Sequence, residues 1–96
     1  MAKKIVTLSG YRIGITHGQG RTGKTVDRAM KCFQDDDVDC IIFGHSHIPY
    51  NEFKNNILLF NPGSPTDRRR NEFFSFGLLE LGDRIKARHI FFKTVK

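Results

Sequence analysis

The sequence predicts one α/β domain in which a single βαβ unit is followed by antiparallel β-hairpins. Three observations support this fold class. Apolar residues alternate with polar ones along most of the chain, as in half-buried strands. One segment instead has apolar residues three to four positions apart, as in an amphipathic helix. The third observation is the length: 96 residues are enough for one small hydrophobic core, so we expect residues 1–96 to form a single domain.

The expected βαβ unit lies in the first half of the chain. Alternating apolar residues on either side of the Ser9-Gly10 pair are typical of a short hairpin. A helical period then appears through Val26, Met30 and Phe33. The wholly apolar stretch that follows is typical of a strand buried in a parallel sheet. The predicted elements are strands 4–8 and 11–16, a helix over 24–34 and a strand over 39–44.

The second half predicts two antiparallel hairpins. Asn55-Asn56 is a favoured pair for a type I′ turn, and Gly82-Asp83 is typical of the turn in the second hairpin. An irregular segment from Asn61 to the three consecutive arginines separates the two hairpins. The predicted strands are 48–54 and 57–61, then 73–81 and 84–93.

Composition and charge argue against several classes of protein. The longest apolar stretches have four residues, far below the roughly 20 of a membrane-spanning helix. The first residues lead into a strand pattern rather than a signal peptide, so we expect a cytoplasmic protein without membrane contact. The net charge is +6, but only Arg68-Arg69-Arg70 form a cluster, so a nucleic-acid partner is not indicated. Cys32 and Cys40 lack the spacing of a metal or redox motif, and we expect buried thiols.

Three of the four histidines are expected at one edge of the sheet. His17 follows the first strand of the βαβ unit, and His45 and His47 follow the second. Because the two strands are parallel, their carboxyl ends share one crevice. Imidazole nitrogens are suitable ligands for divalent Mn, Ni, Fe or Zn, so these histidines are candidate metal ligands. The alternative is that they are hydrogen-bonded turn residues. His89, within the last strand, is expected to be structural or exposed.

The loop before the helix matches a different motif. Residues 18–25 satisfy the G-x-x-x-x-G-K-S/T pattern of a phosphate-binding loop. In that hypothesis, backbone N–H groups near Gly18 and Gly23 hold the phosphates of a nucleotide, Lys24 neutralises them, and Thr25 binds Mg²⁺. A second strand should then end in an Asp, and strand 39–44 does not. A glycine-rich loop that only caps the helix is the remaining alternative.

Three segments carry a family resemblance. Ile13–Gly18, Val38–Pro49 and Leu58–Thr66 contain, in this order, the motifs x-H-G, G-H-x-H and N-P-G-S. Together they resemble the C-terminal half of a calcineurin-like metallophosphoesterase, and most of all the small single-domain phosphodiesterases. The resemblance implies a partial metallophosphoesterase sandwich, a metal-dependent phosphoesterase function and a phosphate-ester substrate. Under it, the phosphate-loop match is a coincidence.

The resemblance also implies roles for single residues. In that family two metal ions polarise the phosphoryl oxygen and generate a hydroxide nucleophile. By motif, His17 and His45 would bind one metal ion and His47 the other. Asn61 would lie beside the site as a candidate contact to the substrate phosphate, and the cluster Arg68, Arg69 and Arg70 would meet the anionic substrate. Gln19 stands where the family often has a second histidine.

The sequence lacks three motifs of the family. The motifs D-x-H, G-D-x-x-D and G-N-H-D/E, which supply the bridging Asp, an Asn ligand and a His, do not occur in it. Three hypotheses therefore remain: a phosphoesterase that is incomplete or weakly active alone, a non-catalytic metal-binding or interaction module, and a nucleotide binder. Because the strands of this half should leave an open strand edge and an apolar face, we expect a homo-oligomer or a complementary N-terminal half as partner.

Overall fold

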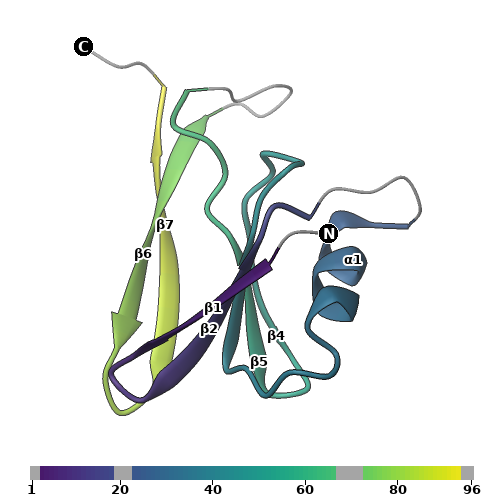
Figure 1. Cartoon of the computed structure of the whole chain (residues 1–96). Coiled ribbons are helices and arrows are strands. Elements are labelled where there is room, and N and C mark those ends of the chain that lie inside the picture. Colours follow the sequence, from purple (N-terminus) through teal and green to yellow (C-terminus); the bar gives the residue numbers. More distant parts are fainter. Residues whose placement is uncertain (1–2, 19–22, 67–72, 94–96) are drawn as a thin grey trace.

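The computed structural model of the chain describes residues 3–18, 23–66 and 73–93. Two strands precede a helix, and five strands follow it (Figure 1). The elements are β1 (Lys3–Leu8), β2 (Tyr11–Thr16), α1 (Thr25–Cys32), β3 (Cys40–Phe43), β4 (Tyr50–Lys54), β5 (Ile57–Asn61), β6 (Phe74–Leu81) and β7 (Ile85–Phe92). The α/β class predicted from the sequence is confirmed.

Five of the strands form a mixed sheet in the order β1-β2-β3-β5-β4. β2 and β3 are parallel neighbours connected through α1, which confirms the βαβ unit. β5 also lies parallel to β3, and β1 and β4 pair antiparallel at the two edges. The three parallel strands therefore end at one edge of the sheet, just before His17, just before Gly44 and at Asn61.

The predicted hairpin turns have the backbone that their residues favour. Asn55 and Asn56 have φ of 52° and 64°, as the two central residues of a type I′ turn require. Ser9 and Gly10 have φ of 51° and 82° and connect β1 to β2 in the same way. Both turns match the twist of their strands, which sets the register of each hairpin.

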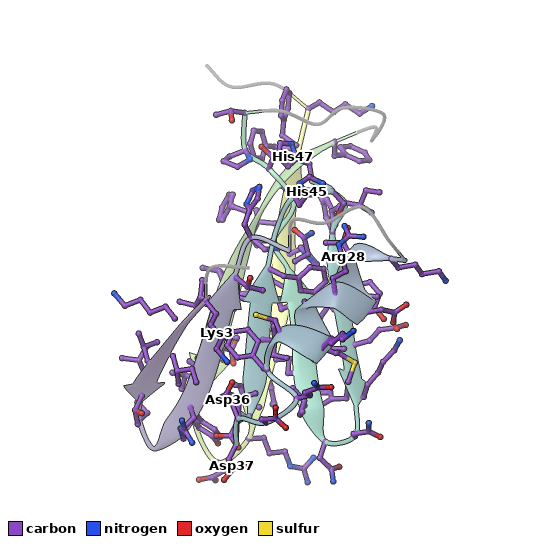
Figure 2. The ribbon with its side chains drawn as sticks, turned by 45° about the vertical axis from the view of Figure 1, so that its right-hand side comes forward. Lys3, Arg28, Asp36, Asp37, His45 and His47 are labelled. Atoms are coloured by element: carbon purple, nitrogen blue, oxygen red, sulfur yellow. The ribbon has the colours of Figure 1, made fainter. Side chains whose placement is uncertain are left out.

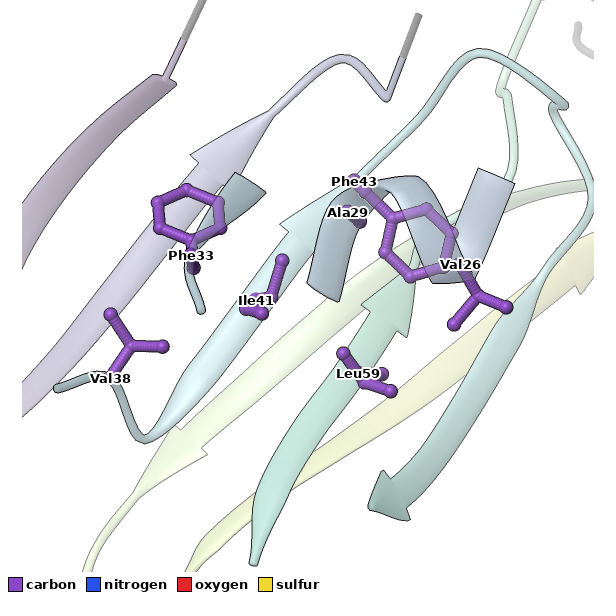
Figure 3. Packing of buried hydrophobic residues seen from close by; sticks show 7 residues of the cluster. All are labelled: Val26, Ala29, Phe33, Val38, Ile41, Phe43 and Leu59. Carbon is purple, nitrogen blue, oxygen red and sulfur yellow. The ribbon is translucent and has the colours of Figure 1, made fainter. Parts of the chain in front are cut away.

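α1 covers one face of the five-stranded sheet. The helix is shorter than the predicted 24–34, because Phe33 already has a non-helical φ of −110° and two N–H groups of this turn bond back to the last helical carbonyls. The ring of Phe33 lies against Gly14 of β2, where no side chain is in the way. Figure 3 shows the resulting core, which consists of Val26, Ala29, Phe33, Val38, Ile41, Phe43 and Leu59.

The β6–β7 hairpin forms a second layer on the opposite face of the sheet (Figure 1). Its residues Ile85, Leu79 and Leu81 pack against Ile13, Cys40 and Leu58 of the larger sheet. The two layers make the sandwich that the sequence predicts, with α1 as an additional outer layer. In the described part of the chain this second sheet has only two strands, so each has one unpaired edge.

Several large apolar side chains remain uncovered. Leu8 and Ile15 lie on the same face as Val6 and Ile13, towards the hairpin, yet they are 52% and 40% exposed. Phe76 is 42% exposed and alternates with the inward-packed Ser75, so it points away from the larger sheet. The hairpin thus covers only part of one face and has an uncovered face of its own.

Both cysteines are free thiols. Cys40 is buried as predicted, whereas Cys32, near the end of α1, is only half-buried. No helix within the described ranges is long and apolar enough to cross a membrane.

Candidate metal centre

Two of the three predicted histidine ligands meet at the carboxyl edge of the sheet. His17 directly follows β2, and His45 comes two residues after β3. Their ring centroids lie 5.5 Å apart with the ring planes at 80°, and the Gly44 N–H donates to the carbonyl oxygen of His17 at 3.3 Å. Figure 2 shows His45 and His47 at one end of the molecule and Asp36 towards the other, where Asp36 pairs with Lys3 at 2.6 Å. Asp36 thus lies away from the histidines.

The turn after β3 has a strained backbone. His45 has a φ of 72° and His47 a φ of 59°. Outside the two hairpin turns, these are the positive-φ residues other than glycine among the described residues. A left-handed conformation costs a residue with a Cβ about 1–3 kcal/mol, and such strain is often found at functional sites. The strain therefore favours the hypothesis that the turn has a functional role over that of an ordinary connection.

The Asn61 side chain forms hydrogen bonds to this turn. The residue ends β5 and has no exposed surface. Its Nδ2 donates to Ser46 Oγ at 3.2 Å and makes a longer contact of 3.4 Å with the Gly44 carbonyl oxygen, while its Oδ1 accepts from the Gly63 N–H at 3.0 Å. The amide is thus engaged within the protein. Its suggested role as a contact to substrate phosphate stays a prediction, and the geometry favours a supporting role instead.

The second sheet holds the segment that contains Asn61. His89 Nε2 lies 2.6 Å from the Asn61 carbonyl oxygen, and the His89 ring packs on Phe60 at 4.7 Å between centroids. The Ser75 hydroxyl donates to the carbonyl oxygen of Pro62 at 2.9 Å. The sequence pattern suggested a structural or exposed role for His89, and the structure shows a structural one. Ser75 gave no such signal, because its contact depends on how the two sheets pack.

The donor set near His17 is incomplete within the described residues. There, no three or more His, Cys, Asp or Glu side chains come together as a group that could hold a metal ion. Consequently neither His47 nor a carboxylate from the described ranges completes the His17–His45 pair. The two imidazoles fit part of a metal centre, and their role as ligands stays a prediction, as does that of His47.

Arg28 closes the loop that resembles a phosphate-binding loop. Its guanidinium donates to the carbonyl oxygens of Gly18 (3.1 Å) and Gly23 (2.7 Å) and to the Thr25 hydroxyl (3.2 Å). A phosphate cradle would need N–H groups there rather than carbonyl oxygens. Lys24, the residue just before α1, is exposed. At the two described ends of this loop the carbonyl oxygens are thus bonded to Arg28, a contact that the sequence motif alone did not reveal. Nucleotide binding through Gly18, Gly23, Lys24 and Thr25 stays a prediction.

A pocket of about 340 Å³ lies between the start of α1 and the segment after β3. Although Lys24 and Thr25 line it, so do Val26, Phe43, Ile48 and Tyr50, and this largely apolar wall gives phosphate groups few partners. Arg68, Arg69 and Arg70, predicted to meet the substrate, and Gln19 lie outside the described residues.

The family follows from a comparison of sequences. Residues 1–84 match the family model of the calcineurin-like phosphoesterase superfamily domain. The chain belongs to this superfamily. A probable metallophosphoesterase from Methanocaldococcus jannaschii is 32% identical over 89 residues, which are 92% of this chain and 46% of that protein. The chain thus spans about half the length of the curated phosphoesterase it matches.

Solved structures share the phosphoesterase fold over almost the whole chain. A predicted phosphoesterase from Streptococcus pneumoniae superposes with a TM-score of 0.76 at 22% identity, covering 93% of this chain and 53% of that one. An archaeal phosphodiesterase gives 0.73 at 21% identity, with 94% and 50% covered. Vps29 from Entamoeba histolytica, complexed with Zn²⁺, gives 0.70 at 23% identity, with 93% and 59% covered. These likenesses confirm the fold class, a partial metallophosphoesterase sandwich.

Proposed function

We propose that this chain is the histidine-bearing half of a metal-dependent phosphoester hydrolase. The observation that carries the proposal is the His17–His45 pair at the carboxyl edge of the parallel strands, with ring centroids 5.5 Å apart. Ligand sites of open α/β sheets lie at such edges. Membership of the calcineurin-like phosphoesterase superfamily supports the reaction class.

Each residue of the pair has a role in this proposal. Neutral imidazoles of His17 and His45 bind one divalent metal ion, and His47 contributes to a second. A bound ion of this kind acts as a Lewis acid on a phosphoryl oxygen and lowers the pKa of coordinated water. The turn fixes the backbone of His45, and with it the direction of the Cα–Cβ bond, before any ligand binds, which lowers the entropy cost of binding.

We propose further that a second polypeptide segment supplies the missing carboxylates. The described residues contain no third ligand for the pair, and two cations held by neutral imidazoles alone would repel each other. The uncovered face of β1 and β2, with Leu8 and Ile15, and the open edges of the two-stranded sheet are suitable surfaces for added strands. Alone, the chain is expected to be weakly active or inactive.

Metal binding tests the first part of the proposal. Titration calorimetry with Zn²⁺ and with Mn²⁺ should show binding that His17→Ala and His45→Ala each reduce by about 10-fold or more, since each removes a ligand. Lys24→Ala is the control: it changes an exposed residue of the phosphate-loop motif and should leave metal binding unchanged. Binding that survives both histidine changes would contradict the proposal. Loss of ATP binding in Lys24→Ala would instead favour the nucleotide alternative.

Hydrolysis of bis(p-nitrophenyl) phosphate tests the second part. The chain with Mn²⁺ should be nearly inactive, and activity should rise when it is mixed with a polypeptide that comprises the part of the M. jannaschii relative outside the match. His45→Ala should abolish that gain. Full activity of the chain alone, lost in His45→Ala, would show that no second segment is needed. Metal binding without any rise in hydrolytic activity on mixing would favour the hypothesis of a non-catalytic module.

A further inference from the structure

We propose that Asn61 is a positioning residue, which holds the turn Gly44–His47 in the conformation that presents the histidine ligands. This inference rests on the proposed function only where it concerns metal ligands. It goes beyond the family motif, in which Asn61 was expected to face the substrate. The observation behind it is the combination of a strained turn and a buried amide that bonds to that turn.

The burial of Asn61 requires its amide to be fully bonded. A buried amide without partners costs about 1–3 kcal/mol in proteins, so a residue with no exposed surface is kept polar only when its bonds are made. Within the described residues, no buried side-chain nitrogen or oxygen lacks a partner. For Asn61 these partners are Ser46 Oγ and Gly44 O on one side and the Gly63 N–H on the other. The side chain therefore connects the turn to the segment after β5.

The contacts reach both histidines of the pair. Gly44 accepts from Asn61 through its carbonyl oxygen, at 3.4 Å, and donates through its N–H to the carbonyl oxygen of His17. The same Gly44 carbonyl oxygen accepts from the Ser46 N–H at 2.9 Å, which closes the turn around His45. One side chain thus supports the backbone next to His17 and on both sides of His45.

Asn61 is itself held from the second sheet. His89 bonds to its carbonyl oxygen, and Ser75 bonds to the next carbonyl along the chain. The backbone that carries the Asn61 amide is therefore bonded to the second sheet, in addition to its pairing within the larger one. This is the arrangement expected of a residue that fixes the geometry of a neighbouring ligand.

NMR measurement of the backbone at residues 45 and 47 tests the inference without metal or partner. Asn61→Asp keeps the size and the acceptor for the Gly63 N–H but replaces the donor. Ser46→Ala removes the acceptor in the turn, and with it the contact from the Ile48 N–H. The ³J(HN–Hα) couplings and ¹³Cα and ¹³Cβ shifts should report positive φ at both histidines in the unmodified chain. In both variants φ should become negative or mixed.

Asn51→Asp is the matched control. Like Asn61, Asn51 is an asparagine of the larger sheet with a bond to the second sheet: its Nδ2 donates to the Ala87 carbonyl oxygen at 2.7 Å. No bond from Asn51 to the turn is present among the described contacts. This variant should keep positive φ at His45 and His47. The inference is overturned if Ser46→Ala, together with any folded Asn61→Asp, keeps the conformation of the unmodified chain. If Asn61→Asp does not fold, the result for Ser46→Ala alone decides between the two outcomes.

Zn²⁺ affinity provides the readout that a purely structural role would not change. In Ser46→Ala it should fall by about 10-fold or more, as for partners that orient metal ligands. Unchanged affinity despite an altered turn would overturn the positioning role. If the unmodified chain does not bind Zn²⁺, the proposed function fails, and the φ measurements still decide whether Asn61 holds the turn.

Discussion

His45 occupies a backbone conformation that a side chain makes unfavourable, and this leads to the first prediction. His45→Ala and His45→Gly both remove the imidazole, but only glycine tolerates the φ of 72° without strain. The unfolding free energy of His45→Gly should therefore exceed that of His45→Ala by about 1 kcal/mol. Urea unfolding of the two variants measures the difference. An alanine variant that is as stable as the glycine variant would show that the turn is not strained.

Cys40 leads to a prediction on pH. Burial, with a smaller contribution from Asp39, raises the pKa of the Cys40 thiol to about 12, whereas a thiol in an unfolded chain ionises near pH 8.5. Between these values the unfolded state has lost a proton that the folded state keeps. Stability from this group is therefore complete below about pH 8.5 and decreases as the pH rises towards 12.

Denaturant unfolding at pH 9 and pH 10 measures this effect. Over that interval the unmodified chain should lose up to about 1 kcal/mol more stability than Cys40→Ala. Equal losses in the two proteins would contradict the assigned burial of Cys40.

At the scale of elements, the contact between α1 and β2 depends on a glycine. A Cβ on Gly14 would lie 2.7 Å from a ring carbon of Phe33, and both residues are buried. Gly14→Ala should therefore displace the end of α1 and lower the unfolding free energy by about 1–3 kcal/mol. Thermal or urea unfolding measures the loss.

Gly82→Ala is the control for this substitution. Gly82 lies in the turn between β6 and β7, where an added Cβ meets nothing within 4 Å. We expect a change within about 0.5 kcal/mol. Similar losses in both variants would mean that the Gly14 effect does not come from the packing of Phe33, since the loss of chain entropy in a Gly→Ala change by itself stabilises the folded state.

For the whole molecule, the uncovered apolar faces predict self-association when no complementary segment is present. Ile15 lies on the open face of the larger sheet and Phe76 on the outer face of the hairpin, and burial of such groups favours association by about 25 cal/mol per Å². Light scattering at micromolar concentration should detect a dimer or larger species. A stable, well-folded monomer would contradict this expectation.

Charge-matched variants distinguish these faces from a general effect of charge. Ile15→Lys and Phe76→Lys each replace an uncovered apolar side chain by a cation and should shift the chain towards monomer. Thr7→Lys adds the same charge at an exposed polar position of β1 and should have a much smaller effect. If all three act alike, repulsion between chains of net charge +6 is the cause instead.

Much of the fold was predictable because its signals are local. The alternation in β1 and β2, the helical period of α1 and the turn pair Asn55-Asn56 each describe a few neighbouring residues. Predicted boundaries were wrong where a tertiary contact ends an element, as at Phe33, whose ring packs on Gly14. The location of His17 and His45 at one edge of the sheet was predictable because the two strands of a βαβ unit are parallel.

The sequence by itself determined the fold class, the order of the elements and the superfamily of this protein, since periodicity and short motifs are properties of neighbouring residues. Only the tertiary structure decided that β5 lies parallel to β3, which brings Asn61 next to the turn Gly44–His47. It also decided that Arg28 closes the glycine-rich loop. These side-chain contacts join residues 5–15 positions apart, and hydrophobic patterns report which face of an element is buried but not which polar partner lies across from it.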